Sequence, residues 1–175
     1  MAIETIHLQM LPYSPGQLLA LIEGVQQFEE KTGLTAANGL RDFMVSDDVS
    51  PAWLAQLRAS TVADPWVHGF ALVDRESRSV VGSAGFKGAP EEGMVEIAYG
   101  IVADYQGRGY ATEAAAALVA FAFENARVSM IRAHTLPTVN ASTRVLAKCG
   151  FEHIGEIVDP EDGLVWRWER RKEGI

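Results

Sequence analysis

The chain opens with a strand pattern and then changes to a helix pattern. Apolar and polar residues alternate loosely over residues 3–11 and the alternation ends at Pro12, which is typical of a half-buried strand. Ser14, followed by Pro15 and by a glutamine three residues after the serine, has the composition of a helix start, so we expect a helix over 14–30. A second Ser-Pro pair predicts a short helix over 50–60. We therefore expect two helices before the main strands.

From residue 66 the pattern becomes mainly that of strands. Apolar runs separated by turn residues predict strands over 66–74, 79–88, 94–102, 128–136, 151–158 and 164–170. The first two of these runs are joined by a short turn, as in an antiparallel hairpin. Apolar residues at helical spacing predict helices over 110–125 and 141–148, the second ending at Gly150. The expected order is one strand, two helices, three strands, helix, strand, helix and two strands.

Length, composition and charge narrow the class of protein. A chain of 175 residues with 48% hydrophobic content can build one compact domain, which we expect to span 1–175. The net charge of −8 argues against a nucleic-acid partner and favours small cationic ones. The first ten residues carry an acid where a signal peptide carries Lys or Arg, and the apolar run at 114–123 covers only half of a membrane span of roughly 20 residues. We expect a cytoplasmic protein that does not bind membranes.

The segment DYQGRGYATEA, residues 104–114, lies between an expected strand and an expected helix. The free N–H groups of a helix N-terminus attract anions, and Gly107 and Gly109 would let a phosphate approach the backbone closely. Arg108 could add a charge-assisted contact. The spacing excludes the phosphate loop that ends in Gly-Lys-Ser/Thr and the dinucleotide fingerprint Gly-x-Gly-x-x-Gly. The segment therefore predicts a diphosphate site of another kind.

The run Gln106-Gly-Arg-Gly-Tyr-Ala111 resembles the Gln/Arg-x-x-Gly-x-Gly/Ala motif with which GNAT-superfamily N-acetyltransferases hold the diphosphate of acetyl-CoA. Two longer segments, EIAYGIVADYQGRGYATEA and NASTRVLAKCGF, resemble other parts of that fold. Within the superfamily the chain is most similar to the branch named for the ribosomal-protein N-terminal acetyltransferases. The resemblance implies an α/β fold with a single mixed, mostly antiparallel sheet and flanking helices, and the expected order of elements agrees with it.

The same resemblance implies acetyl-CoA as cosubstrate, with no metal. The implied cofactor-binding residues are Ile101, Val102, Gln106, Gly107, Arg108, Gly109, Tyr110, Ala111, Thr112, Asn140 and Arg144. The backbone N–H groups of 107–112 would hold the diphosphate, and those of Ile101 and Val102 would pair with the pantetheine arm. Asn140 follows Val139, which occupies the usual asparagine position. Asn140 can either contact pantetheine or cap the next helix.

Acetyl transfer to an amine needs a proton acceptor for the amine, a donor for the oxyanion and a proton for the thiolate. Glu96, inside the apolar strand, is the candidate base, and we expect burial to raise its pKa. The alternative is that Glu96 lies on a solvated or ion-paired face. The resemblance implies a backbone N–H near Gly100 or Ile101 for the oxyanion. Leu146 stands where many members of the family have a tyrosine that protonates the thiolate. The proton could instead come from Tyr99, Ser142 or water, or the thiolate could simply be released.

The sequence leaves the acceptor and two other functions open. We expect direct attack by a primary amine, either a protein N-terminus or a small, cationic amine, in a ternary complex. Acidic and aromatic residues of the first helices and their connections would suit such an acceptor, and these are Asp47, Asp48, Trp53 and Trp66. The chain could also be an acyl-CoA-binding domain with little catalysis, or an unrelated nucleotide-binding protein. Either a monomer or a homodimer is compatible with the sequence.

Two further kinds of chemistry receive little support from the sequence. The single cysteine, Cys149, has no His or acid spaced to activate it as a nucleophile. The four histidines form no i, i+4 pair and have no cysteine partner at metal spacing, so we expect no zinc site.

Overall fold

The computed structural model describes residues 1–45 and 49–173. Asp47 and Asp48, two of the predicted acceptor residues, lie outside the described residues. The strands are β1 (Ile3–Glu4), β2 (Leu8–Pro12), β3 (Thr35–Ala36), β4 (Phe70–Asp74), β5 (Ser79–Phe86), β6 (Met94–Ile101), β7 (Met130–Thr135), β8 (Glu152–Asp159) and β9 (Gly163–Arg171). The helices are α1 (Pro15–Glu23), α2 (Val25–Thr32), α3 (Leu40–Met44), α4 (Pro51–Ala59), α5 (Pro65–His68), the 3₁₀ turn η1 (Ala103–Tyr105), α6 (Tyr110–Glu124) and α7 (Ala141–Lys148).

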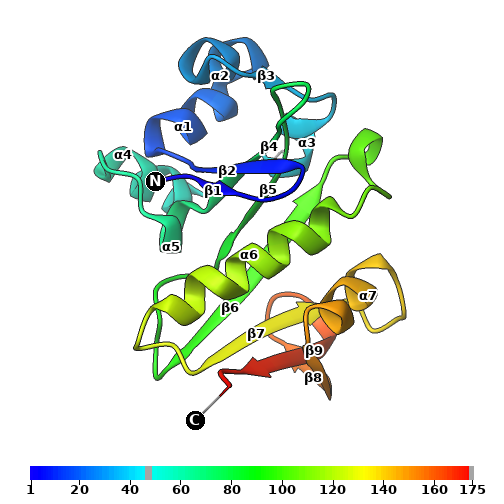
Figure 1. The fold of residues 1–175 in the computed structure, drawn as a ribbon. Coiled ribbons are helices and arrows are strands. Elements are labelled where there is room, and N and C mark those ends of the chain that lie inside the picture. Colours follow the sequence, from blue (N-terminus) through cyan, green and yellow to red (C-terminus); the bar gives the residue numbers. More distant parts are fainter. Residues whose placement is uncertain (46–48, 174–175) are drawn as a thin grey trace.

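The strands form one sheet in the order β1-β2-β4-β5-β6-β7-β9-β8, and the short β3 pairs with β5. Only the β3–β5 and β6–β7 pairs are parallel, and the other described pairs are antiparallel. Figure 1 shows α1 to α5 grouped around the β1–β5 half of the sheet, with α7 and the β8–β9 hairpin at the other end. The expectation of a mixed, mostly antiparallel sheet with flanking helices is confirmed.

The N-terminal third departs from the expected two helices. The predicted helix over 14–30 is divided at Gly24. The N–H of Gly24 donates to the carbonyl of Ala20 and ends α1, and α2 begins at the next residue. The predicted strand over 66–74 begins only at Phe70, because Asp64 caps the short helix α5 and Gly69, with a φ of 74°, ends it. Five helices therefore precede β4 in the described part of the chain.

Helix α6 packs closely against the middle of the sheet (Figure 1). Its buried residues are Tyr110, Ala114, Ala115, Leu118, Val119 and Ala122. The alanines have high helix propensity, and their small side chains let the helix approach the strands. Helix α6 also contacts α7.

Strand β6 changes partners halfway along its length. Residues 94–96 pair with β7, and this pairing ends at Glu96 opposite Arg132. Residues 97–101 pair with β5 only, while β7 continues in pairing with β9. The two central strands therefore separate after Glu96, and the open end of this gap faces the loop that precedes α6.

Candidate functional site

The separation of β6 from β7 leaves backbone groups of β6 without a strand partner. The N–H of Val102 donates to the carbonyl of Val81 at 2.9 Å, so it is used within the sheet. Backbone groups of an antiparallel strand point alternately to either side, so the N–H of Ile101 points away from β5 and into the gap. The expected pairing of the Val102 N–H with pantetheine is therefore wrong, and Ile101 is favoured over Gly100 as oxyanion donor.

The loop after β6 presents bare backbone at the start of α6. The Gln106 side-chain Nε2 donates to the carbonyl of Ile101 at 2.9 Å and ties the loop to the strand. Gly107 and Gly109 have φ values of 78° and 81°, a left-handed conformation that favours glycine. Gly109 is the N-cap of α6 and supplies no side-chain cap. The first N–H groups of this helix are therefore available to an anion.

A cavity of about 430 Å³ lies between this loop, β6 and α7. It is lined by Phe43, Tyr99, Gly100, Ile101, Tyr105, Gln106, Gly107, Gly109, Tyr110, Ala111, Thr112, Ala141, Ser142, Arg144, Val145 and Lys148. Two of these residues are cations, and none of the lining residues in the described part of the chain is an acid. Although the whole chain carries a net charge of −8, the lining of this cavity is locally basic.

Most of the predicted cofactor residues line this cavity, but three do not. Besides Val102, these are Arg108 and Asn140. The guanidinium of Arg108 lies 4.5 Å from the centre of the Tyr105 ring and donates to the carbonyl of Asp104, at the outer side of the loop. Asn140 caps α7, because its side chain accepts from the N–H of Thr143 and its own N–H donates to the Thr143 hydroxyl. Of the two roles open for Asn140, helix capping is the one observed.

The candidate proton donors lie at the α7 side of the cavity. The Tyr99 hydroxyl, which comes from β6, donates to the carbonyl of Ser142 at 3.4 Å, and both residues line the cavity. Burial raises the pKa of Tyr99 far above its usual range, so the hydroxyl is protonated at neutral pH but is a weaker acid than an exposed tyrosine. Leu146, at the usual tyrosine position, is fully buried in the core and does not line the cavity.

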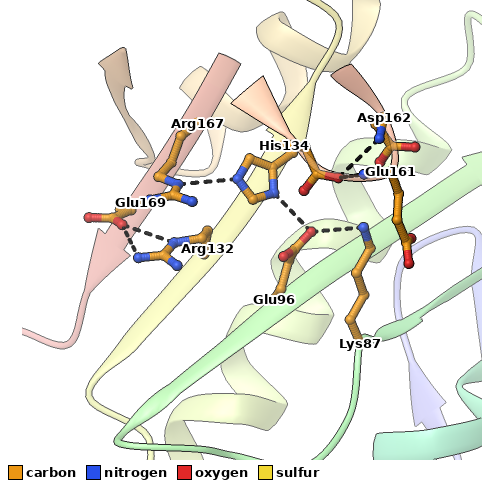
Figure 2. A network of polar contacts seen from close by, with 9 residues as sticks. Lys87, Glu96, Arg132, His134, Glu161, Asp162, Arg167 and Glu169 are labelled. Atoms are coloured by element: carbon orange, nitrogen blue, oxygen red, sulfur yellow. Dashed lines mark hydrogen bonds and ion pairs between the residues drawn. The ribbon is translucent and has the colours of Figure 1, made fainter. Parts of the chain in front are cut away.

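Glu96 lies outside the cavity, in a polar network shown in Figure 2. Its Oε2 atom is 2.9 Å from Nζ of Lys87 and 3.0 Å from Nδ1 of His134. His134 in turn accepts a hydrogen bond from Nε of Arg167 at 3.2 Å. This is the ion-paired arrangement that the sequence left open as the alternative for Glu96.

The expectation of a raised pKa for Glu96 is wrong. Burial does act to raise the pKa of this carboxyl, but hydrogen bonds from His134 and Lys87 and the charge of Lys87 outweigh it, so its pKa lies below the usual value. Glu96 is therefore ionised at neutral pH. Burial also acts to lower the pKa of Lys87, but the contacts with Glu96 and the charges of Asp162 and Asp159 raise it overall.

A second buried polar contact supports the start of α6. The Tyr110 hydroxyl donates to Oδ1 of Asp74 at 2.6 Å, and both residues are buried. Burial raises the pKa of Asp74, but bonds from Tyr110 and Ser77 bring it below its usual value. This contact fixes the first residue of α6 against the end of β4.

Sequence reasoning missed two lining residues of special interest, Phe43 and Lys148. Lys148 stands four residues after Arg144, so helical spacing alone could have placed both cations on one face of α7. Phe43 comes from α3, which was not predicted, and a Cβ built on Gly100 would lie 2.2 Å from its ring. No local signal indicates that contact, because it joins residues far apart in the chain.

The other candidate residues have structural surroundings. Trp66, predicted as a possible acceptor contact, packs against Phe86 and Phe121 in an aromatic cluster, and Trp53 is partly buried against the core. Burial raises the pKa of Cys149, which disfavours the thiolate that nucleophilic catalysis would need. The described ranges contain no cluster of metal-binding side chains and no helix long and apolar enough to cross a membrane.

The sequence is similar to a known protein family and to two curated proteins. Residues 19–152 match the family model described as acetyltransferase (GNAT) domain. The uncharacterized N-acetyltransferase YjdG of Bacillus subtilis (strain 168) is 34% identical over 89 residues, which are 50% of this chain and 51% of that protein. The uncharacterized N-acetyltransferase p20 of Bacillus licheniformis is 29% identical over 53% of this chain and 52% of that protein. The chain thus spans about half the length of the curated relatives it matches.

Solved structures show the same fold at low identity. The ribosomal-protein-S5-alanine acetyltransferase from Vibrio fischeri has a TM-score of 0.70 and 16% identity, covering 99% of this chain and 98% of that one. The ribosomal-protein alpha-N-acetyltransferase RimL, solved in complex with coenzyme A, has a TM-score of 0.67 and 14% identity over 98% of both chains.

Proposed function

Because the chain belongs to the GNAT acetyltransferase family, as the match over residues 19–152 shows, we propose that it transfers the acetyl group of acetyl-CoA to a primary amine. The proposed reaction is a direct attack in a ternary complex. We also propose the branch of the ribosomal-protein acetyltransferases, since two structural neighbours carry that name. The acceptor is then a protein N-terminus or a small amine of similar chemistry.

The observation that carries this proposal is the basic cavity at an uncapped helix N-terminus. The N–H groups around Gly107 and Gly109 supply donors for a diphosphate, and Arg144 and Lys148 supply positive charge on the opposite wall. These residues fit the phosphates of acetyl-CoA. The cavity also reaches Ile101, whose N–H faces the gap between the strands, so a thioester at that point would meet a backbone donor.

Amine attack forms a carbon–nitrogen bond at the thioester carbonyl and breaks the carbon–sulfur bond. The Ile101 N–H would stabilise the oxyanion, and the Tyr99 or Ser142 hydroxyl would give a proton to the departing thiolate. Glu96 would take the proton that the amine loses, through water, because it does not line the cavity. Its lowered pKa keeps it ionised and ready to accept that proton, although it makes Glu96 a weaker base than the sequence suggested.

The first test is ligand-dependent thermal stability with acetyl-CoA, CoA, ATP and NAD. A ligand at about 100 times its Kd should add roughly 2.7 kcal/mol to the free energy of unfolding. We expect this rise with acetyl-CoA and CoA and none with ATP or NAD. A larger rise with ATP or NAD would instead support an unrelated nucleotide-binding protein.

The second test separates an enzyme from an acyl-CoA-binding domain. Release of the CoA thiol is followed with a peptide bearing a free N-terminal alanine, and in parallel with an alkyl diamine as the small cationic acceptor. We expect turnover with at least one of them and a loss of about a hundredfold in Glu96→Gln. Binding of acetyl-CoA without turnover on either acceptor would favour the binding domain, and full activity of Glu96→Gln would remove Glu96 from the mechanism.

A further inference from the structure

We infer that His134, held by Arg167, is a positioning residue for Glu96 and directs its Oε1 atom toward the acceptor amine. This inference rests on the proposed function, in which Glu96 receives the proton of the amine. His134 lies on the neighbouring strand β7, outside the segments that resemble the family, and its Nδ1 reaches Glu96 from there (Figure 2).

The contact with Arg167 sets the position of the proton on the imidazole. The Nε–H of Arg167 donates to Nε2 of His134, which requires a lone pair on that nitrogen. The ring proton must therefore lie on Nδ1, which is the atom 3.0 Å from Oε2 of Glu96. Arg167 thus makes His134 a hydrogen-bond donor to Glu96, as an orienting partner fixes a catalytic histidine in other enzymes.

The two contacts of Glu96 leave one of its oxygens free. Lys87 and His134 both approach Oε2, and Oε1 has no hydrogen-bond or ion-pair partner among the described residues. The Glu96 and His134 side chains are only 17% and 11% exposed, so neither has much freedom to rotate. A carboxylate held in this way presents one fixed oxygen as its proton acceptor.

The surroundings of Glu96 come from four parts of the chain. The charged and titratable groups on this face are Lys87 after β5, Arg132 and His134 on β7, Arg167 and Glu169 on β9, and Asp159, Glu161 and Asp162 around the β8–β9 turn. Arg132 is bound by Glu169 at 2.8 Å, and the Lys87 side chain is 54% exposed, against 11% for His134. His134 is therefore the partner of Glu96 with the most restricted geometry.

The test uses the difference between two substitutions of His134. The amide nitrogen of an asparagine can occupy nearly the position of Nδ1, so His134→Asn retains a donor to Glu96, whereas His134→Ala removes it. We expect His134→Ala to lower the plateau of kcat/KM for the acceptor by about tenfold, the loss of one hydrogen bond to a charged group. We also expect its acid limb to move to higher pH, because the carboxyl loses a contact that lowers its pKa. In His134→Asn, the plateau of kcat/KM and the position of the acid limb should both lie close to those of the parent chain.

Glu169→Gln serves as the matched control, because it weakens the neighbouring Arg132 pair without touching Glu96. A carbon-13 NMR titration of the carboxyl groups, with Glu96 assigned from Glu96→Gln, gives a readout that needs no acceptor. Equal behaviour of His134→Ala and His134→Asn, or an unmoved Glu96 titration in His134→Ala, would overturn the positioning role. If Glu96→Gln is fully active while the titration still moves, the proposed role of Glu96 fails and the contact is structural only.

Discussion

The contact between Gly82 and β6 gives the sharpest test of how the sheet supports the site. Gly82 pairs with Ile101, and a Cβ built on it would lie 2.1 Å from the carbonyl oxygen of Gly100 and 3.2 Å from Cα of Ile101. Ordinary contacts of a Cβ begin near 3.4 Å, so Gly82→Ala forces the backbone of β6 outward by more than an ångström. Overpacking of this kind costs about 2 kcal/mol, and in a chain of this size should lower the Tm by roughly 4–8 °C.

Gly100→Ala, on the facing strand, is the matched comparison. Its Cβ would meet the Phe43 ring at 2.2 Å, but Phe43 is 47% exposed and its side chain can turn away, whereas the backbone beside Gly82 cannot. We expect Gly100→Ala to cost less than about 1 kcal/mol. In a Phe43→Ala background the same substitution should cost still less, because the ring that it meets is gone.

The assay for both variants is urea unfolding with and without acetyl-CoA. Gly82→Ala should lose most of the stabilisation by acetyl-CoA as well as stability itself, because the displaced segment includes Ile101. Equal free energies of unfolding for Gly82→Ala and Gly100→Ala would contradict this prediction, since it depends on the difference between a fixed backbone and a rotatable side chain. A normal acetyl-CoA response in a destabilised Gly82→Ala would refute only the link to the cofactor.

Three further predictions concern single groups. Since the pKa of Glu96 is lowered in the folded state, its contribution to stability is present above its usual pKa of 4.5 and is lost as the pH falls through the lower folded value; urea unfolding should therefore show less acid sensitivity in Glu96→Gln than in the parent chain, and equal sensitivity would contradict this. Tyr110→Phe removes the hydroxyl that donates to the buried Asp74 at 2.6 Å, so it should lower the free energy of unfolding by about 2 kcal/mol in the same measurement. A loss below about 0.5 kcal/mol would contradict this prediction. Tyr99→Phe should lower kcat by at least about tenfold if its hydroxyl protonates the thiolate, and an unchanged kcat would leave Ser142 or water as the donor.

The second half of the fold could be predicted from sequence because its signals are local. The alternation in β6, the glycines before α6 and the apolar spacing of α6 all lie within the elements they predict. The first half could not be predicted as well, since its helices are short and end at individual caps. Gly24 divides one expected helix, and the Asp64 cap turns the expected start of a strand into α5. A helix cap depends on one or two residues, so a pattern of apolar positions read over a longer segment does not reveal it.

The candidate site divides in the same way. The loop residues from Gln106 to Thr112 follow one another in sequence, so a motif could place nearly all of them at the cavity. The state of Glu96 depends on Lys87, His134 and Arg167, which lie on other segments. Burial alone predicted the wrong direction for its pKa, because ion-pair partners from distant segments are not visible in the sequence around it.

The alternation of side chains along β6 explains how two substrates could meet at this strand. Tyr99 and Ile101 face the cavity beside α7, whereas Glu96 and Gly100 belong to the opposite set of a strand with period two, toward Lys87 and Phe43. Pairing with β7 ends at Glu96, so beyond it the strand can be approached from both faces at its open edge. On the proposed function, acetyl-CoA would lie on the α7 side and the amine on the side of Glu96. The reaction would then take place at residues 99–101, because there the cavity also reaches Phe43 from the other face.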